Sequence, residues 1–346
     1  MSLESGLQRA WYGPAWLSVP LWPLGWLFGA IVALRRGLYS IGLLRRHRVS
    51  VPVVVVGNLT VGGTGKTPIT AWLARQLSLR GHRVGVVLRG YGGRHSGAPR
   101  LVTASDDPAD VGDEALLHAR RAPHVVVIGA DRVAAASLAA EQGAEAVVCD
   151  DGLQHLRLAR DYEIAVVDAV RGLGNRHLLP AGPLREPASR LEAVDAVLFA
   201  RRGPGDAAPV NPRRPYVAEA RFEPGLAVNL LSGERRPLTA FQGAPVHAVA
   251  GIGHPAAFFA SLGEAGLDVE GHALPDHAAL DPHALPFADD ATVLMTEKDA
   301  VKCTKYARPG WWYVELDVVF DRGTAGDLIA LVLERTGLTG AGVNLG

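Results

Sequence analysis

The apolar residues of the first 200 positions fall into short β-branched runs that alternate with stretches of helical spacing. The run at 52–56 is continuous, which is typical of a strand buried on both faces of a parallel sheet. Because alternating strands and helices form parallel sheets covered on both sides, the pattern predicts a doubly wound α/β fold. Further strands are predicted at 84–88, 125–128, 146–149, 164–167 and 196–199, and a helix at 131–142.

A second, smaller α/β domain is predicted in the C-terminal part of the chain. The stretch 201–215 is rich in Pro, Gly and Arg, which is typical of a linker. Short strands are expected at 216–222 and 227–231, and strand and helix alternate again from 246. The length of 346 residues suits two domains. The predicted units are an N-terminal segment (1–48), an α/β domain (49–200), a linker with a two-stranded ribbon (201–235) and the smaller domain (236–346).

The N-terminal segment is apolar and is expected to associate with a membrane. No charge occurs from 15 to 34, and basic residues flank this stretch on both sides. Its length could just span a bilayer, but Pro20 and Pro23 interrupt it, so only 24–34 is predicted as uninterrupted helix. Trp residues favour the membrane–water interface, and basic residues are drawn to anionic lipid. The residues concerned are Trp11, Trp16, Trp22 and Trp26, with Arg9, Arg35, Arg36, Arg45, Arg46 and Arg48.

We therefore expect this segment to lie in the interface of an anionic membrane surface rather than to cross the bilayer. A signal peptide and a buried core helix are the alternatives. No small-residue cleavage site follows the apolar run, and a core helix would not need so many Trp residues.

Composition narrows the class of partner. The chain has 35 basic and 35 acidic residues, so no overall field favours nucleic acid as a partner. Cys149 and Cys303 are the only cysteines and lack metal-ligand spacing, which fits a reducing compartment such as a bacterial cytoplasm.

A phosphate-binding loop is predicted directly after the first buried strand. Residues 57–67 read GNLTVGGTGKT and lead into a helix, the context that a P-loop requires. Glycines let backbone N–H groups turn toward phosphate oxygens, Lys66 can reach the β and γ phosphates of ATP, and the Thr67 hydroxyl can bind Mg²⁺. Thr60 stands where the generic pattern has Gly. The expected nucleotide contacts here are Thr60, Val61, Gly62, Gly63, Thr64, Gly65, Lys66 and Thr67.

Two carboxylates follow another buried strand. Asp150 and Asp151 come directly after 146–149, and ligands of doubly wound sheets bind at the carboxyl ends of the strands. This pattern is typical of a Walker B arrangement, in which an Asp holds or orders the metal ion. An acidic pair that caps a helix or turn is the plainer alternative.

An ordered set of motifs resembles the tetraacyldisaccharide 4'-kinase family. The motifs are GNLTVGGTGKTP (57–68), RGYGG (89–93), GDE (112–114), DDGLQH (150–155), LPAGPLRE (179–186), GIGHP (251–255) and TEKDAVK (296–302). The resemblance implies a P-loop kinase that transfers the γ-phosphate of ATP to the 4'-hydroxyl of a tetraacylated disaccharide 1-phosphate. It places this step of lipid A biosynthesis at the cytoplasmic face of the bacterial inner membrane.

The resemblance also implies residue roles. Asp113 and His277 would pair as the base that accepts the sugar proton, while Lys66 acts on the phosphates. Asp150, Asp151 and Glu186 would surround Mg²⁺ together with Thr67, and Arg185 would face phosphate. Tyr91 could touch the nucleotide or the sugar.

Two other classes of protein share parts of the pattern. A membrane-bound P-loop ATPase switch would act on a protein partner and release only inorganic phosphate. A ligase of the dethiobiotin synthetase type would not need the Trp-rich basic N-terminus. A labelled lipid product separates the kinase from the switch, whereas a ligase should act on soluble acceptors without detergent.

Overall fold

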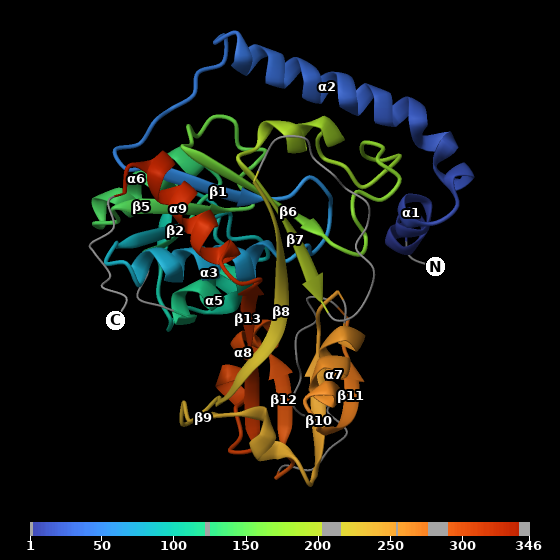
Figure 1. Ribbon diagram of the computed structural model, residues 1–346, viewed down its shortest axis with the longest axis vertical. Helices are drawn as coiled ribbons and strands as arrows, with labels where there is room; N and C mark the ends of the chain where they lie inside the picture. Colours follow the sequence, from blue (N-terminus) through green and yellow to red (C-terminus); the bar gives the residue numbers. More distant parts are fainter. Residues whose placement is uncertain (1–2, 122–124, 203–215, 254, 276–289, 339–346) are drawn as a thin grey trace.

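One mixed sheet of 13 strands forms the centre of the molecule and extends through both lobes seen in Figure 1. The computed structural model describes residues 3–121, 125–202, 216–253, 255–275 and 290–338. The strand order is β11-β10-β12-β13-β8-β7-β6-β1-β5-β2-β4-β3, with β9 (Arg235–Arg236) paired to β8.

The strands of the larger lobe confirm the sequence prediction. They pair in parallel, except for the short β3, and all but β3 were expected. Their bounds are β1 (Val53–Gly57), β2 (Val84–Leu88), β3 (Arg100–Val102), β4 (Val125–Ile128), β5 (Ala146–Asp150), β6 (Tyr162–Asp168) and β7 (Ala196–Arg202).

Helices cover both faces of this part of the sheet. Alternate residues of β1 point to opposite faces, so Val54 and Val56 pack with one layer, and Val53 and Val55 with the other. The first layer contains α3 (Lys66–Ser78), α5 (Asp113–Arg121) and α9 (Thr324–Thr336); the second contains α6 (Arg132–Glu141) and η2 (Ala188–Ala193). The short α4 (Pro108–Val111) precedes α5.

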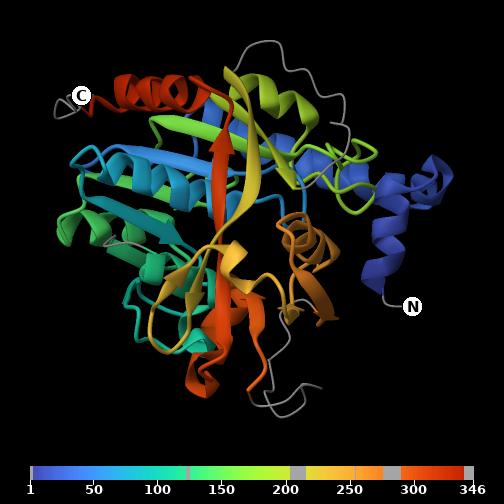
Figure 2. The same ribbon diagram turned by 60° about the horizontal axis from the view of Figure 1, so that its bottom comes forward.

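The smaller lobe continues the same sheet. Its strands are β10 (Pro245–Ala250), β11 (Asp268–Ala273), β12 (Val293–Thr296) and the long β13 (Trp311–Phe320). Its helices are α7 (Pro255–Glu264), α8 (Glu297–Cys303), η3 (Leu238–Phe241) and η4 (Thr304–Tyr306). Figure 2 shows β8 and β13 running side by side from one lobe into the other.

Strand β8 (Tyr216–Asn229) differs from the expectation of two short strands. It is one strand of 14 residues that pairs in parallel with β7 and then antiparallel with β13. Pro224 and Gly225 would end a lone strand, but the pairing continues past them through an irregularity between Val314 and Leu316 of β13. The expected linker at 203–215 lies outside the described residues.

The N-terminal segment forms α1 (Leu3–Tyr12), η1 (Ala15–Leu21) and α2 (Trp22–Ser40), and α2 lies across the top of the larger lobe in Figure 1. The expectation that only 24–34 is uninterrupted helix was wrong, since α2 has 19 residues. Pro23 stands in the first turn of α2, where its missing N–H has no acceptor to lose, and Pro20 belongs to η1.

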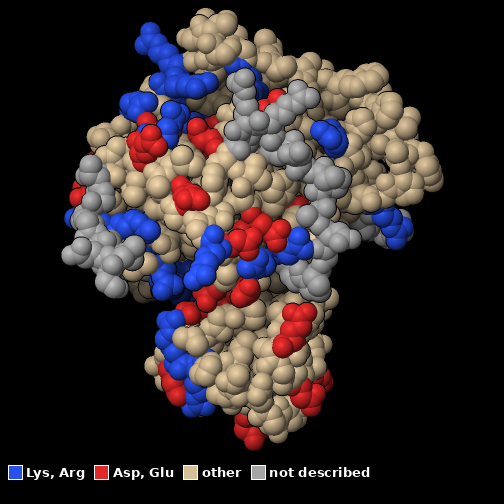
Figure 3. All heavy atoms as spheres, viewed as in Figure 1, with Lys and Arg blue, Asp and Glu red and all other residues tan. Residues whose placement is uncertain are grey.

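Much of α2 faces outward. The most apolar window of 18 residues within 15–40 has a mean hydropathy of 1.8 and only 11% of it is buried, so length and composition would allow the stretch to cross a bilayer. Signal sequences pass the same test. In Figure 3 the surface over α2 is largely uncharged, and basic side chains gather toward its C-terminal end. Its exposed large side chains are Leu24, Trp26, Leu27, Ile31 and Leu34.

The Trp residues of this segment have two different environments. Trp16 and Trp26 are about 70% exposed, at 71% and 69%. Trp11 is buried, and its indole N–H donates to the Pro180 carbonyl at 2.9 Å. Trp22 packs against the His177 ring with centroids 5.1 Å apart. Two Trp side chains therefore attach the segment to the loop at 175–183, while two remain outside.

Candidate active site

The loop between β1 and α3 has the backbone shape of an anion-binding turn. Gly62 and Gly65 have φ values of +107° and +91°, a left-handed region that glycine adopts without strain. A Cβ on Gly65 would lie 2.4 Å from the Phe222 ring of β8, so only glycine fits there. Gly62 and Gly63 are exposed and have open space around them. The N-terminus of α3 begins directly after this turn, at Lys66.

The structure explains why Thr60 replaces the first glycine of the generic pattern. Residue 60 forms an antiparallel bridge with Leu184, and the neighbouring Val61 N–H donates to the Pro183 carbonyl at 2.9 Å. The Arg185 N–H donates to the Leu59 carbonyl at 2.7 Å. This part of the loop is therefore extended and backed by the LPAGPLRE segment, so it does not need the positive φ that would require glycine.

Lys66 and Arg185 converge on Asp151. The Lys66 ammonium lies 3.7 Å from one Asp151 carboxylate oxygen, and the Arg185 guanidinium donates to both oxygens at 2.9 and 3.1 Å. Asp151 itself has φ +51°, because the chain turns sharply after β5 and the Gly152 N–H bonds back to Val56 at 3.2 Å. Two cationic groups are thus gathered beside the glycine turn.

Asp150 is the buried carboxylate at the end of β5. One oxygen, Oδ2, lies 3.3 Å from Nε2 of His118, whose side chain is fully buried. Burial alone raises the pKa of Asp150, but the hydrogen bond with His118 and the charges of His118 and Lys66 outweigh it, so the pKa lies below its ordinary value. Within the described part of the chain the second oxygen, Oδ1, has no hydrogen-bond partner.

Glu114 extends this cluster along α5. The residue as a whole is exposed, but its carboxyl group is recessed beside Asp150. The loss of solvation there, reinforced by the negative charge of Asp150, raises the pKa of Glu114. Lys66, His118 and Lys298 act in the opposite direction without cancelling the shift. A carboxyl with a raised pKa beside one with a lowered pKa is an arrangement often found at functional sites.

Asp113 lies at the junction of the two lobes. The Lys302 ammonium of α8 is 3.7 Å from Asp113 and 3.3 Å from the buried Asp299. Asp299 also accepts the Gly251 N–H at 2.9 Å and the Thr296 hydroxyl at 2.6 Å. Motifs GDE, GIGHP and TEKDAVK therefore meet around one ionic group. His277, the expected partner of Asp113, lies outside the described residues.

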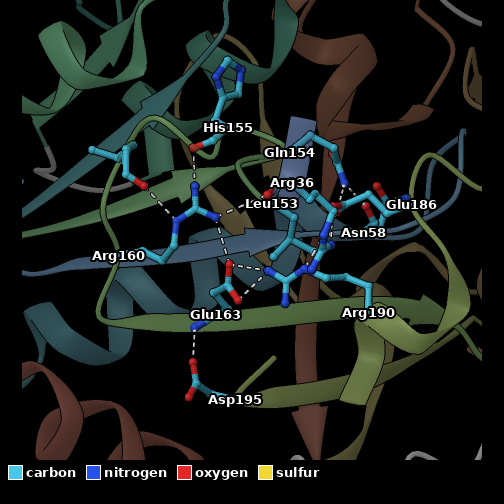
Figure 4. Close-up of polar contacts among 11 residues, drawn as sticks. Arg36, Asn58, Leu153, Gln154, His155, Arg160, Glu163, Glu186, Arg190 and Asp195 are labelled. Atoms are coloured by element: carbon cyan, nitrogen blue, oxygen red, sulfur yellow. Dashed lines mark hydrogen bonds and ion pairs between the residues drawn. The ribbon is translucent and has the colours of Figure 1, made fainter. Parts of the chain in front are cut away.

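Glu186 stands in a buried ionic network shown in Figure 4. One of its oxygens accepts from Arg36 of α2 at 2.7 Å, and the other accepts from Gln154 at 3.2 Å. Gln154 also donates to the Asn58 carbonyl at 3.1 Å and contacts Arg185 at 3.4 Å. Helix α2 is therefore linked through Glu186 and Gln154 to the start of the glycine turn.

The RGYGG segment packs directly on the GDE motif. A Cβ on Gly112 would lie 2.4 Å from the Tyr91 carbonyl, and one on Gly93 would lie 2.4 Å from the Asp110 carbonyl. Tyr91 is 71% exposed. His155 is less accessible: burial and nearby arginines lower its pKa to about 4, so the ring is neutral at physiological pH.

Sequence reasoning assigned no role to Glu114 or His118. They are four residues apart on α5 and so occupy the same side of the helix as it approaches Asp150. Their i,i+4 spacing, which begins at the Glu of GDE, was the available signal. That signal became specific only when the fold placed α5 beside β5.

A largely apolar groove lies between α2 and the loop that carries Glu186. Its volume is about 560 Å³. Its lining includes Trp22, Trp26, Val32, Arg36 and Leu178. The groove therefore combines an apolar wall with two guanidinium groups, those of Arg176 and of Arg36, and Arg36 bonds to Glu186.

Comparisons with known proteins give one consistent family. The model of the family LpxK, tetraacyldisaccharide-1-P 4'-kinase, matches residues 17–334. A protein of Halorhodospira halophila named tetraacyldisaccharide 4'-kinase is 51% identical over 298 residues, covering 86% of this chain and 87% of that protein. A Pseudomonas aeruginosa protein of the same name is 46% identical over 321 residues, covering 92% and 94%.

A solved structure agrees with these relatives. It is described as the "apo" form of LpxK from Aquifex aeolicus in complex with ATP, and it matches with a TM-score of 0.81 and 29% sequence identity. The match covers 92% of this chain and 99% of that one. Family model, relatives and fold confirm the resemblance seen in the motifs, and the chain belongs to the tetraacyldisaccharide 4'-kinase family.

Proposed function

We propose that this protein transfers the γ-phosphate of ATP to the 4'-hydroxyl of a tetraacyldisaccharide 1-phosphate during lipid A biosynthesis. Family membership makes it an ATP-dependent lipid kinase. The observation that carries the proposal is the convergence of Lys66 and Arg185 on Asp151 beside a glycine turn that opens a helix. Such a turn presents N–H groups and a positive helix end to phosphate oxygens.

The nucleotide is proposed to lie along 60–67, with Lys66 at its terminal phosphates. In this structure Lys66 and Arg185 both face Asp151. Phosphate oxygens carry more negative charge than one carboxylate, so these cations would turn toward a bound triphosphate. Tyr91, exposed on the RGYGG segment, is proposed to contact the nucleotide or the sugar.

The donor set fits Mg²⁺. Asp150 offers a buried oxygen that lacks a partner among the described residues, and Thr67 lies close enough to affect its pKa. Mg²⁺ prefers such carboxylate and hydroxyl oxygens, and when bound it neutralises charge on the phosphates. Asp151 and Glu186 remain proposed ligands. Both are engaged by arginines here, and Glu186 would have to exchange Arg36 or Gln154 for the ion.

Asp113 is proposed to act as or orient the base, together with His277. Its carboxylate faces Lys302, so it is held at the junction of the two lobes, where the acceptor hydroxyl would meet the γ-phosphate. A positioned base contributes about 10²- to 10⁴-fold to such a transfer.

The acceptor is proposed to reach the site along α2 from the cytoplasmic face of the inner membrane. The exposed apolar side of α2 would enter the lipid interface, and the arginines after it would face anionic headgroups. The groove between α2 and the Glu186 loop offers an apolar wall for the acyl chains.

The deciding experiment follows labelled γ-phosphate from ATP in detergent micelles that contain the lipid acceptor. A kinase moves the label to the lipid, and Lys66→Ala should reduce transfer by at least about 100-fold. Asp113→Ala and His277→Ala should also lose transfer while retaining ATP binding. Release of inorganic phosphate alone would instead support the ATPase switch, and full transfer by both base variants would refute the base assignment.

Membrane attachment is tested separately with vesicles of anionic and neutral lipid. Replacing Leu27 and Ile31 with Ser should weaken binding more than tenfold, because each side chain contributes about 1.5–3 kcal/mol when buried. Leu79→Ser, at an equally exposed position in the larger lobe, is the matched control. Unchanged vesicle binding by the α2 variant would contradict the proposed orientation.

A further inference from the structure

Three metal-ligating side chains lie together on the smaller lobe, apart from the cluster around Asp150. They come from the neighbouring parallel strands β10 and β11, in which His247 is in register with Glu270. His272 follows Glu270 by two residues, so both point to the same face of the sheet. Local geometry therefore puts two imidazoles and one carboxylate side by side.

The distances among their donor atoms match those around a single ion. Nδ1 of His247 lies 3.1 Å from Nε2 of His272 and 3.3 Å from a Glu270 oxygen. Nε2 of His272 lies 3.8 Å from the other Glu270 oxygen. Ligands bonded at about 2.0–2.1 Å to a tetrahedral zinc ion are about 3.3 Å apart, so the three atoms need only small movements to share one ion.

We propose that His247, Glu270 and His272 bind one divalent transition-metal ion of the Zn²⁺ class, with water at the remaining position. Two imidazoles and a carboxylate are a set that Zn²⁺ favours, whereas Mg²⁺ prefers oxygen ligands alone. The Glu270 side chain is 65% exposed, so it can rotate onto the ion at little cost. The imidazoles are more enclosed, at 24% and 15% exposure, which limits the ring positions before binding.

Hydrogen bonding alone explains this arrangement less well. Nδ1 of His247 approaches both a ring nitrogen and a carboxylate oxygen, but one nitrogen carries at most one proton and can donate to only one of them. A cation at the common point would satisfy all three groups at once.

The position indicates a structural role. β11 ends the strand order, paired to β10, and α7 packs on the other face, where Phe259 leaves no room for a Cβ on Gly271. An ion bound by residues from both strands would hold β11 to β10. His247 precedes Ala250 by three residues, about 10 Å along the strand, so the ion would stand apart from Gly251 and its contact with Asp299.

The test uses the full-length protein in detergent, stripped of metal with a chelator and titrated with Zn²⁺ by calorimetry and with Co²⁺ by visible absorption. One ion per chain and the absorption of tetrahedral Co²⁺ are expected. Substituting a residue that only contacts a metal ligand typically weakens metal binding by roughly 10- to 100-fold, and His272→Ala, which removes a ligand, should weaken Zn²⁺ binding by more than this. Glu270→Gln, at an exposed position, should weaken Zn²⁺ binding without affecting folding.

Two controls separate this site from others. His95→Ala removes a partly exposed histidine of the larger lobe and should leave Zn²⁺ binding unchanged. Asp150→Asn alters the proposed Mg²⁺ site and should also leave it unchanged, so failure of the kinase proposal would not affect the result. Zn²⁺ affinity that is the same in the parent, His272→Ala and Glu270→Gln proteins would overturn the proposal.

Discussion

The contact between His118 and Asp150 should control the affinity for Mg²⁺. His118 is fully buried, and its Nε2 lies 3.3 Å from Oδ2 of Asp150, which is itself 2% exposed. In His118→Phe the ring keeps a similar volume but cannot form this hydrogen bond. Hydrogen bonds to charged groups contribute about 1.5–3 kcal/mol, and losing a partner behind a metal ligand typically costs 10- to 100-fold in metal affinity.

The same change should move the pH profile. In the parent protein the hydrogen bond with His118 helps to hold the pKa of Asp150 below its ordinary value, so the charged carboxylate persists as the pH falls. This contribution to stability is present above the unfolded pKa of about 3.9 and is lost as the pH falls through the lower folded pKa. Without His118 the pKa rises, and the acid limb of activity should shift to higher pH.

The assay measures phosphate transfer over a range of Mg²⁺ concentrations and pH values. His118→Phe should need about 10- to 100-fold more Mg²⁺ for half-maximal activity and should recover part of its rate when Mg²⁺ is saturating. His118→Gln retains an N–H donor and should rescue part of the affinity. If His118→Phe lowered only the melting temperature, with Mg²⁺ dependence and pH profile unchanged, the role assigned to His118 would be wrong.

Two further predictions concern Glu114 and the junction between the lobes. The folded pKa of Glu114 lies above its unfolded value, so its contribution to stability is complete below the unfolded pKa and is lost as the pH rises through the folded pKa. Near pH 7, Glu114→Gln should therefore unfold at an equal or higher denaturant concentration than the parent protein. The gain in free energy of unfolding should be under about 1 kcal/mol because the residue is exposed. A clear loss of stability at this pH would contradict the raised pKa of Glu114. Arg121→Ala should lower the free energy of unfolding in urea by about 2–4 kcal/mol, because Arg121 donates to the buried Glu297 at 2.7 Å. Arg120→Ala loses only an exposed hydrogen bond to Thr304 and should lower it by under about 1 kcal/mol. Equal losses in the two arginine variants would refute the pairing.

The elements that local pattern specifies could be predicted from the sequence. The continuous run at 52–56 became β1, and the helical spacing after Thr67 became α3, because burial on both faces and a period of 3.6 leave direct marks in the chain. The N-terminal segment was found from its lack of charge. The length of α2 was underestimated because a proline interrupts a helix only in its interior. Pro23 lies in the first turn of α2, where it is tolerated, and the sequence did not show that the helix begins at Trp22.

The motifs of the proposed active site were also visible in sequence, but their contacts were not. Lys66 and Asp151 are 85 positions apart, and their approach follows from the pairing of β1 with β5. His118 gave no specific signal, since an isolated histidine on a helix is more often structural than functional. Only packing of α5 against the sheet shows which carboxylate it meets.

The sequence by itself determined the family, the strand, glycine turn and helix at 53–78, and the apolar N-terminus, because each is encoded by residues close together in the chain. Tertiary structure decided that β8 is one strand through both lobes, that Glu186 joins Arg36 to the glycine turn, and that His247, Glu270 and His272 share one face. Those features depend on strand register and on contacts between distant segments, which the local periodicity of a sequence does not record.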